Sequence, residues 1–372
     1  MKKGFNQIVS NIPGFGSINI FYNAGGKVEK EGTRGISHLA EHLLFKAVDS
    51  IDEKLSAHGI KFNALTSEDY VYFYFNGLNE SLRLFERDIL KILSYIPSKE
   101  EFEKEKKIVL SEYSNVFSKQ NAIFPNILRK YYNRFGAIGY KKDVEEITYE
   151  QFLDFITIHF KQPTFISRIG ETDFEEYYKS LVYSDFTTIT YEEKDYGEEF
   201  LEFNTSSIHP LIAHWFTTDL ETNILDFISL YLSSGLSSPL YQSLREKNGL
   251  VYYVGADTIF DGNIKPFCVY YECENKNKKD AKKVVKELFK NLELNEERFE
   301  NIKKMIDVKL KKQNIFNFDT TFNKTNFEDV DYEPLKNLTY EEFQKIMKKF
   351  CKDFLKNEKI AIVQKGIKIW AL

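Results

Sequence analysis

Cysteine is scarce in this chain of 372 residues, which contains only Cys268, Cys273 and Cys351. The number is odd and no Cys-x-x-Cys pair occurs, so the sequence indicates neither a disulfide framework nor a zinc site built from cysteines. The chain also lacks an excess of basic residues, because 51 Lys and Arg stand against 56 Asp and Glu, for a net charge of −5. This weak acidic balance argues against a nucleic-acid partner.

Long apolar segments are missing as well. No run approaches the ~18 apolar residues that a membrane span needs, and Met1 to Gln7 do not lead into the apolar region of a secretory signal. We therefore expect no membrane partner and a cytoplasmic location. The composition is otherwise that of a globular protein, with 42% hydrophobic and 29% charged residues, and the length allows two domains with real cores.

The stretch from Gly35 to Phe45 carries the most informative pattern. Its apolar residues leave almost no polar face, so it is predicted to be a buried helix. His38, Glu41 and His42 nevertheless lie at positions i, i+3 and i+4, on one side of that helix. Burying these groups without partners would cost roughly 2 kcal/mol or more for each group. Either a metal ion satisfies them, or the histidines are ordinary core residues, and the short pattern alone does not decide between the two.

An open zinc site would need an anionic third ligand, and one later helix offers two glutamates. A capping box formed by Ser98 and Glu101 is expected to start this helix. Glu105 and Glu112 follow seven residues apart, on nearly the same side, beside the apolar stripe. The alternative is that both carboxylates simply reach solvent from the edge of the stripe.

Short β-prone runs begin the chain. Residues 7–10 and 17–22 indicate either a hairpin or a strand-turn-strand unit. Strands are also expected at 61–65 and 70–77, the second of them in the interior of a sheet. Gly59 is expected to end a helix, because a glycine readily takes the left-handed conformation found there.

The polar and charged stretch 184–199 favours a domain boundary. The strands and helices expected after it repeat the first half in outline, which suggests an internal duplication. We therefore predict domains at 1–186 and 187–372, the first of them carrying the histidine motif.

Three separated segments together resemble the pitrilysin or insulinase-type family of zinc metallopeptidases, which includes insulin-degrading enzyme and the mitochondrial processing peptidases. They are Gly35 to Lys46, Glu105 to Glu112, and Gly235 to Tyr252. Their order along most of the chain is far more specific than any one of them. The resemblance implies an α+β fold of two similar domains, each a mostly antiparallel β-sheet covered by helices.

The resemblance also implies a metal site. His38, His42 and Glu112 would bind one Zn²⁺ per chain. Glu105 matches a second family glutamate near the metal, so we place it in the catalytic site and keep it as the rival third ligand. Glu41 would be the general base that takes a proton from a water activated by the metal.

Residues outside the metal site receive roles in the same way. Arg245 and Tyr252 would contact the substrate and stabilise the oxyanion, although without the family they are an ordinary helix charge and a strand aromatic. Asn63 and Ala64 resemble the strand edge that pairs with an extended peptide substrate. The alternative for these two is an edge strand with no such role.

The function implied by the resemblance is a zinc endopeptidase acting on short or unfolded peptides. The alternative is a non-catalytic peptide-binding or scaffold subunit, but such subunits typically lose the motif that is intact here. Short family members pair two chains, so a homodimer is expected, with a heterodimer as the alternative. The sequence does not fix the physiological substrate or the cleavage preference.

Overall fold

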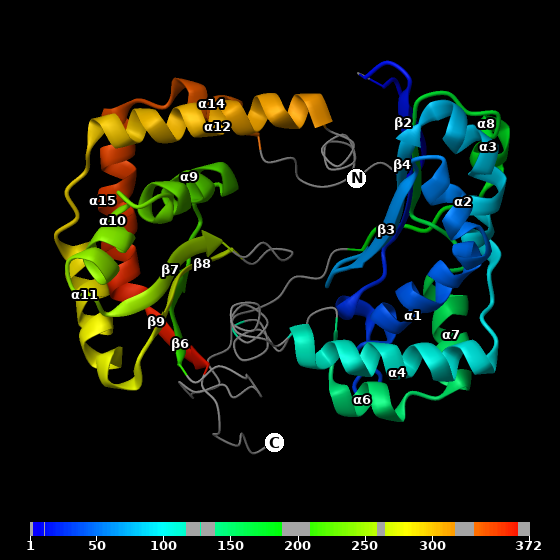
Figure 1. The fold of residues 1–372 in the computed structure, drawn as a ribbon, viewed down its shortest axis with the longest axis horizontal. Helices are drawn as coiled ribbons and strands as arrows, with labels where there is room; N and C mark the ends of the chain where they lie inside the picture. Colours follow the sequence, from blue (N-terminus) through cyan, green and yellow to red (C-terminus); the bar gives the residue numbers. More distant parts are fainter. Residues whose placement is uncertain are drawn as a thin grey trace. The chain divides into compact units, whose positions relative to one another are not determined.

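The protein is described from a computed structural model, which describes residues 3–10, 12–116, 127, 138–187, 209–258, 265–316 and 331–363. These residues form two compact units, each with its own β-sheet and helices (Figure 1). We call the first, with strands β1 to β5, unit 1, and the second, with strands β6 to β9, unit 2. The chain passes between the two units more than once, and the passage after β5 and α8 falls outside the described residues, between 187 and 209. The boundary after 186 therefore stays a prediction.

The sheet of unit 1 has the strand order β1-β5-β2-β4-β3. Its strands are β1 (Gly4–Ile8), β2 (Phe15–Tyr22), β3 (Lys61–Thr66), β4 (Val71–Leu78) and β5 (Phe165–Ile169). Only the β1–β5 pair is parallel, and every other pair is antiparallel. The hairpin alternative for the first two strands is therefore wrong. All five residues of β5 are buried and pair with both neighbours, so a distant strand separates β1 from β2.

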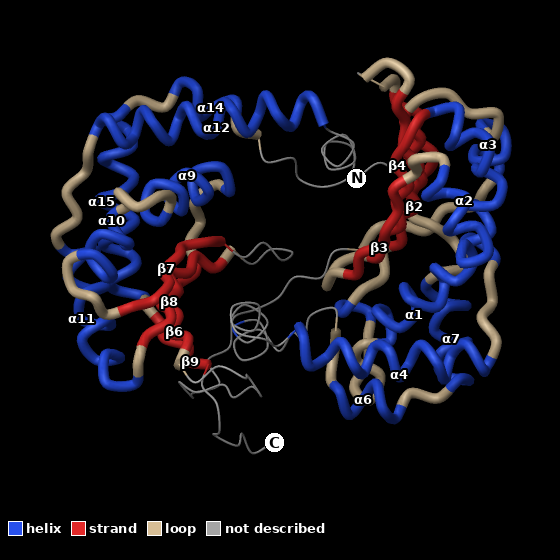
Figure 2. The backbone as a smooth tube through the Cα atoms, in the orientation of Figure 1, coloured by secondary structure: helices blue, strands red, loops and turns tan. Residues whose placement is uncertain are grey.

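The described helices of unit 1 lie on one side of this sheet (Figure 2). They are η1 (Gly26–Val28), α1 (Ile36–Phe45), η2 (Lys46–Ile51), α2 (Asp52–Ala57), α3 (Asn79–Ile89), η3 (Leu90–Ser94), α4 (Lys99–Val116), α6 (Lys141–Glu146), α7 (Tyr149–His159) and α8 (Glu175–Ser180). Two predicted helix ends are confirmed. Gly59 follows α2 with a φ of 71°, and the backbone amides of Ser98 and Glu101 donate to each other's side chains at the start of α4.

Helix α1 packs against β3 and β4 and is anchored in the core of unit 1. Ile18 and Ile20 of β2 belong to the same buried cluster as Leu39 and Leu43 of α1, and all four side chains are fully buried. Each such side chain stabilises the fold by roughly 1.5–3 kcal/mol. The helix that carries the histidine motif is thus held rigidly in the core, as its apolar pattern predicts.

The sheet of unit 2 has the order β7-β8-β6-β9 and is antiparallel throughout. Its strands are β6 (Leu211–Thr217), β7 (Val251–Thr258), β8 (Pro266–Cys273) and β9 (Lys359–Val363). Its helices are α9 (Thr222–Ser233), α10 (Pro239–Tyr241), the π-helical turn η5 (Gln242–Glu246), η6 (Asn275–Asn277), α11 (Lys278–Lys290), α12 (Glu296–Phe316), α14 (Glu333–Asn337) and α15 (Tyr340–Asn357). A capping box of Thr339 and Glu342 starts α15.

The two units repeat one topology. The strand order β5-β2-β4-β3 in unit 1 matches β9-β6-β8-β7 in unit 2, with antiparallel pairing at every step. Helix α1 follows β2, and α9 follows β6 at the equivalent place. The predicted fold class, two similar α+β domains, is confirmed. None of the helices within the described ranges is long and apolar enough to cross a membrane.

Candidate metal centre

The start of α1 is fixed by a buried carboxylate. The backbone amides of Gly35 and Ser37 donate hydrogen bonds of 2.7 and 2.9 Å to the two oxygens of Glu29. Burial raises the pKa of Glu29 to about 7, although these hydrogen bonds lower it. Gly35 itself has a φ of 100° and could not carry a Cβ, which would lie 2.6 Å from Val144. The first turn of the helix is therefore set before the motif begins.

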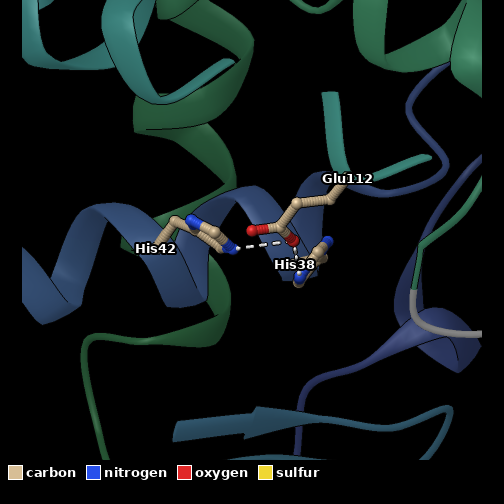
Figure 3. Close-up of side chains that lie close together, drawn as sticks. All are labelled: His38, His42 and Glu112. Carbon is tan, nitrogen blue, oxygen red and sulfur yellow. Dashed lines mark ion pairs between the residues drawn. The ribbon is translucent and has the colours of Figure 1, made fainter. Parts of the chain in front are cut away.

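The two histidines and Glu112 converge from α1 and α4 (Figure 3). The Nε2 atoms of His38 and His42 lie 3.7 and 3.6 Å from the same oxygen of Glu112, Oε2. The two rings are nearly perpendicular, with centroids 4.8 Å apart. The spacing of the histidines follows from the helical period, whereas the approach of Glu112 depends on how α4 packs beside α1.

This arrangement fits a zinc ion. Ligand atoms at 2.0–2.2 Å from a tetrahedral metal lie roughly 3.4 Å from one another, and the donor atoms of His38, His42 and Glu112 all lie within 4.8 Å of one another. Burial, together with the neighbouring His42, lowers the pKa of His38 to about 3. His38 is therefore neutral at ordinary pH, and the neutral imidazole is the form that binds metals.

Glu105 occupies a different place from Glu112. Its Oε2 lies 3.4 Å from Nδ1 of His42, and its Oε1 lies 3.0 Å from the ammonium group of Lys46. Its side chain is 4% exposed, against 39% for that of Glu112. Glu105 thus contacts only the second nitrogen of one histidine, while Glu112 contacts both histidines. The pattern alone could not separate these two glutamates, which lie one helical repeat apart.

Glu41 lies on α1 between the two histidines and is held by strand β3. The hydroxyl of Thr66 donates a hydrogen bond of 2.7 Å to Oε2 of Glu41. The pKa of Glu41 is raised by burial and by Glu112, against the opposite effect of Thr66 and His42. A raised pKa suits a group that must accept a proton and release it again.

Strand β3, which carries Asn63 and Ala64, is the outer strand of its sheet. It pairs only with β4, where Asn63 lies opposite Tyr74 and Ala64 opposite Phe73. Asn63 is exposed, and Ala64 packs partly buried against the core. Its other edge is not paired with any described strand, which is the property needed for adding a peptide as a further strand.

Arg245 and Tyr252 lie in unit 2, close to each other. The Nη1 atom of Arg245 donates to the backbone oxygen of Tyr252 at 3.0 Å, and its guanidinium lies over the ring of Tyr241. The hydroxyl of Tyr252, a half-exposed residue, donates to Glu274 at 3.0 Å. This hydrogen bond raises the pKa of Tyr252. The turn η5 and the strand β7 therefore bring Arg245 and Tyr252 together. Arg245 lies in the π-helical part of this turn, and π-helical turns are often found at functional sites.

Three contacts were not expected from the sequence. Thr66 donates a hydrogen bond to Glu41, Lys46 forms an ion pair with Glu105, and Glu29 accepts from the backbone at the start of α1. Each joins segments that are separate in the chain, so no local period predicts it. Helix α9, the counterpart of α1 in unit 2, contains neither histidine nor glutamate, so the repeat carries no second motif there.

Comparison with known proteins agrees with this geometry. The model described as "Insulinase (Peptidase family M16)" matches residues 13–141, and that described as "Peptidase M16 inactive domain" matches residues 174–306. The chain therefore belongs to the insulinase family, peptidase family M16.

Several individual proteins are similar to this chain. An uncharacterized zinc protease of Rickettsia bellii is 26% identical over 302 residues, covering 73% of this chain and 71% of that protein. The human mitochondrial-processing peptidase subunit beta is 22% identical over 161 residues, covering 40% of this chain and 33% of that protein. A protease from Helicobacter pylori has the same fold, with a TM-score of 0.77, 16% identity and 98% of both chains covered.

Proposed function

We propose that this protein is a zinc-dependent endopeptidase that hydrolyses short or unfolded peptides. One observation carries the proposal: the Nε2 atoms of His38 and His42 both lie within 3.7 Å of one oxygen of Glu112, beside the carboxylate of Glu41. Two neutral imidazoles and one carboxylate leave a zinc ion a free position for water. The name of the zinc-protease relative supports the metal, and we place one ion in each chain.

The residues around the metal site would have separate roles in the reaction. Bound zinc supplies a Lewis acid and makes a water acidic enough to lose a proton near neutral pH. The Glu41 carboxylate accepts that proton and passes it to the leaving amine of the peptide. Glu105 supports His42 from the opposite nitrogen and belongs to the catalytic site without binding the metal.

Substrate binding is assigned to two places. The free edge of β3, at Asn63 and Ala64, would hold an extended peptide by backbone hydrogen bonds, with little preference for its side chains. Arg245 and Tyr252 would contact the same peptide and stabilise the oxyanion with a tyrosine hydroxyl, a contribution of roughly 2.7–4 kcal/mol for donors of this kind. Since Tyr252 donates to Glu274 here, it must leave that partner to do so.

The Glu41→Gln variant tests the proposal. Glutamine keeps the size of the side chain but cannot take up a proton, so the zinc content should be unchanged and hydrolysis of a quenched fluorescent peptide should be lost. Glu53→Gln, on the exposed face of α2, is the matched control and should keep full activity. Unchanged activity of Glu41→Gln would exclude this mechanism, and a chain inactive in every form would favour the alternative, a non-catalytic peptide-binding or scaffold subunit.

Assembly and location complete the proposal. The family's short chains work in pairs, so we expect a homodimer in which both copies carry a complete motif, with a heterodimer as the alternative. Sedimentation with an activity assay checks this, because a fully active monomer would contradict it. The cytoplasm is the expected compartment, to be checked by cell fractionation.

A further inference from the structure

We infer that Thr66 is a positioning residue, which fixes the carboxylate of the general base Glu41 from the end of the peptide-binding strand. The inference rests on the proposed function, since it concerns the same site. The hydroxyl of Thr66 donates to Oε2 of Glu41 at 2.7 Å.

Thr66 is itself held in a tight turn. The next residue, Ser67, donates its amide to the backbone oxygen of Tyr70 at 2.8 Å. The hydroxyl of Ser67 accepts from the amides of Asp69 and Tyr70 at 3.1 Å each. In addition, Thr66 lies opposite Val71 in the β3–β4 ladder. A side chain on such a rigid platform can fix its partner better than one on a loop.

The contact restricts the freedom of Glu41 that matters for proton transfer. The last torsion of a glutamate is broad, so an unheld carboxylate would sample many orientations. With Oε2 held by Thr66, Oε1 would be the oxygen that accepts the proton from water. Holding a reacting group in a productive orientation lowers the barrier without changing how tightly the substrate binds. The expected consequence is a change in kcat and not in KM.

The contact also places the base and the substrate on one element. Asn63, Ala64 and Thr66 all belong to β3. This one strand would therefore position both a peptide paired with its free edge and the carboxylate of Glu41. The position of the scissile bond relative to the base would then be set by the register of the peptide on β3.

The Thr66→Val variant tests the inference, because valine has the shape of threonine but lacks the hydroxyl. We expect kcat to fall about tenfold or more while KM and zinc content stay within about twofold. Thr66→Ser keeps the hydroxyl and should restore most of the activity. The control is Thr157→Val on α7, where the lost hydroxyl donates only to the backbone oxygen of Leu153. Wild-type kcat in Thr66→Val, or no rescue by serine, would overturn the inference.

A second measurement does not depend on activity. Urea unfolding of the zinc-free protein is compared for wild type, Thr66→Val, Glu41→Ala and the double variant. If the two side chains interact, the shift in midpoint caused by Thr66→Val should largely disappear in the Glu41→Ala background. Additive shifts would overturn the inference. Coupling in a protein without peptidase activity would instead count against the proposed function and leave the contact between Thr66 and Glu41 standing.

Discussion

The Nδ1 atom of His42 lies 3.4 Å from Glu105, while the Nε2 atom of the same ring lies 3.6 Å from Glu112. Two glutamates of one helix therefore contact opposite nitrogens of one imidazole. In metal sites the nitrogen that does not bind the metal usually donates to a carboxylate, which fixes the ring and raises its basicity. We therefore expect Glu112 to be a metal ligand and Glu105 to support His42.

The two glutamates should differ in their effect on zinc affinity. Replacing an outer partner of a ligand typically costs 10–100-fold in affinity, so Glu105→Gln should weaken zinc binding by about that factor. Glu112→Gln removes a ligand and should weaken it further. Competition with a chromogenic chelator measures both, and Glu103→Gln, exposed on the same helix, should bind like wild type. Equal losses for the two variants would contradict the assignment.

Acid should destabilise the zinc-free protein through His38. Its pKa is lowered from 6.5 to about 3, chiefly by burial, so between these values the unfolded chain binds a proton that the folded protein does not. The contribution to stability is therefore present above pH 6.5 and is lost as the pH falls toward 3, at up to about 1.4 kcal/mol per pH unit. Urea unfolding at several pH values should show a shallower acid loss for His38→Asn, and identical pH dependence would refute this.

Glu29 should stabilise the start of α1, the helix that carries His38 and His42. Glu29→Ala leaves the amides of Gly35 and Ser37 without their acceptors, and we expect a loss of roughly 1–3 kcal/mol in the free energy of unfolding. Because burial raises the pKa of Glu29 from 4.5 to about 7, its contribution is full below pH 4.5 and declines as the pH rises through 7.

The loss should accordingly be larger at pH 5 than at pH 8 when measured by thermal or urea unfolding. Glu31→Ala, two residues away and exposed, should have little effect at either pH. A loss that grows with pH would show that the hydrogen bonds, and not burial, dominate at Glu29.

A buried ion pair should stabilise strand β5 in the sheet. Arg168 is fully buried, and its Nε lies 3.2 Å from Oε1 of Glu86, which also accepts from Thr172 and Tyr178. Removing one charge of a buried pair leaves the other uncompensated, so Glu86→Gln should cost about 3 kcal/mol or more. Urea unfolding is the measurement, with the exposed Glu80→Gln as control. If Glu86→Gln lowered the free energy of unfolding no more than Glu80→Gln does, the ion pair would have no stabilising role.

The same pair explains what the sequence could not predict. Strand β5 has an arginine at its fourth position, which is typical of a solvent-exposed segment unless a distant partner such as Glu86 is known. Three features could be predicted, because each depends on neighbours within a few residues. They are helix α1, the capping box of α15 and the end of α2 at Gly59. The contact of Thr66 with Glu41 depends on the packing of β3 against α1 and was not.

The separation of Glu112 from the two histidines has a mechanical consequence. With 69 residues between His42 and Glu112, a zinc ion bound to all three would act as a cross-link that closes a long segment of chain and ties two helices together. Because the three ligands come together only in the folded chain, the free energy of binding the ion would add to the free energy of folding. Chelation should therefore raise amide hydrogen exchange along both helices, and a metal bound there would stabilise the fold as well as supply its chemistry.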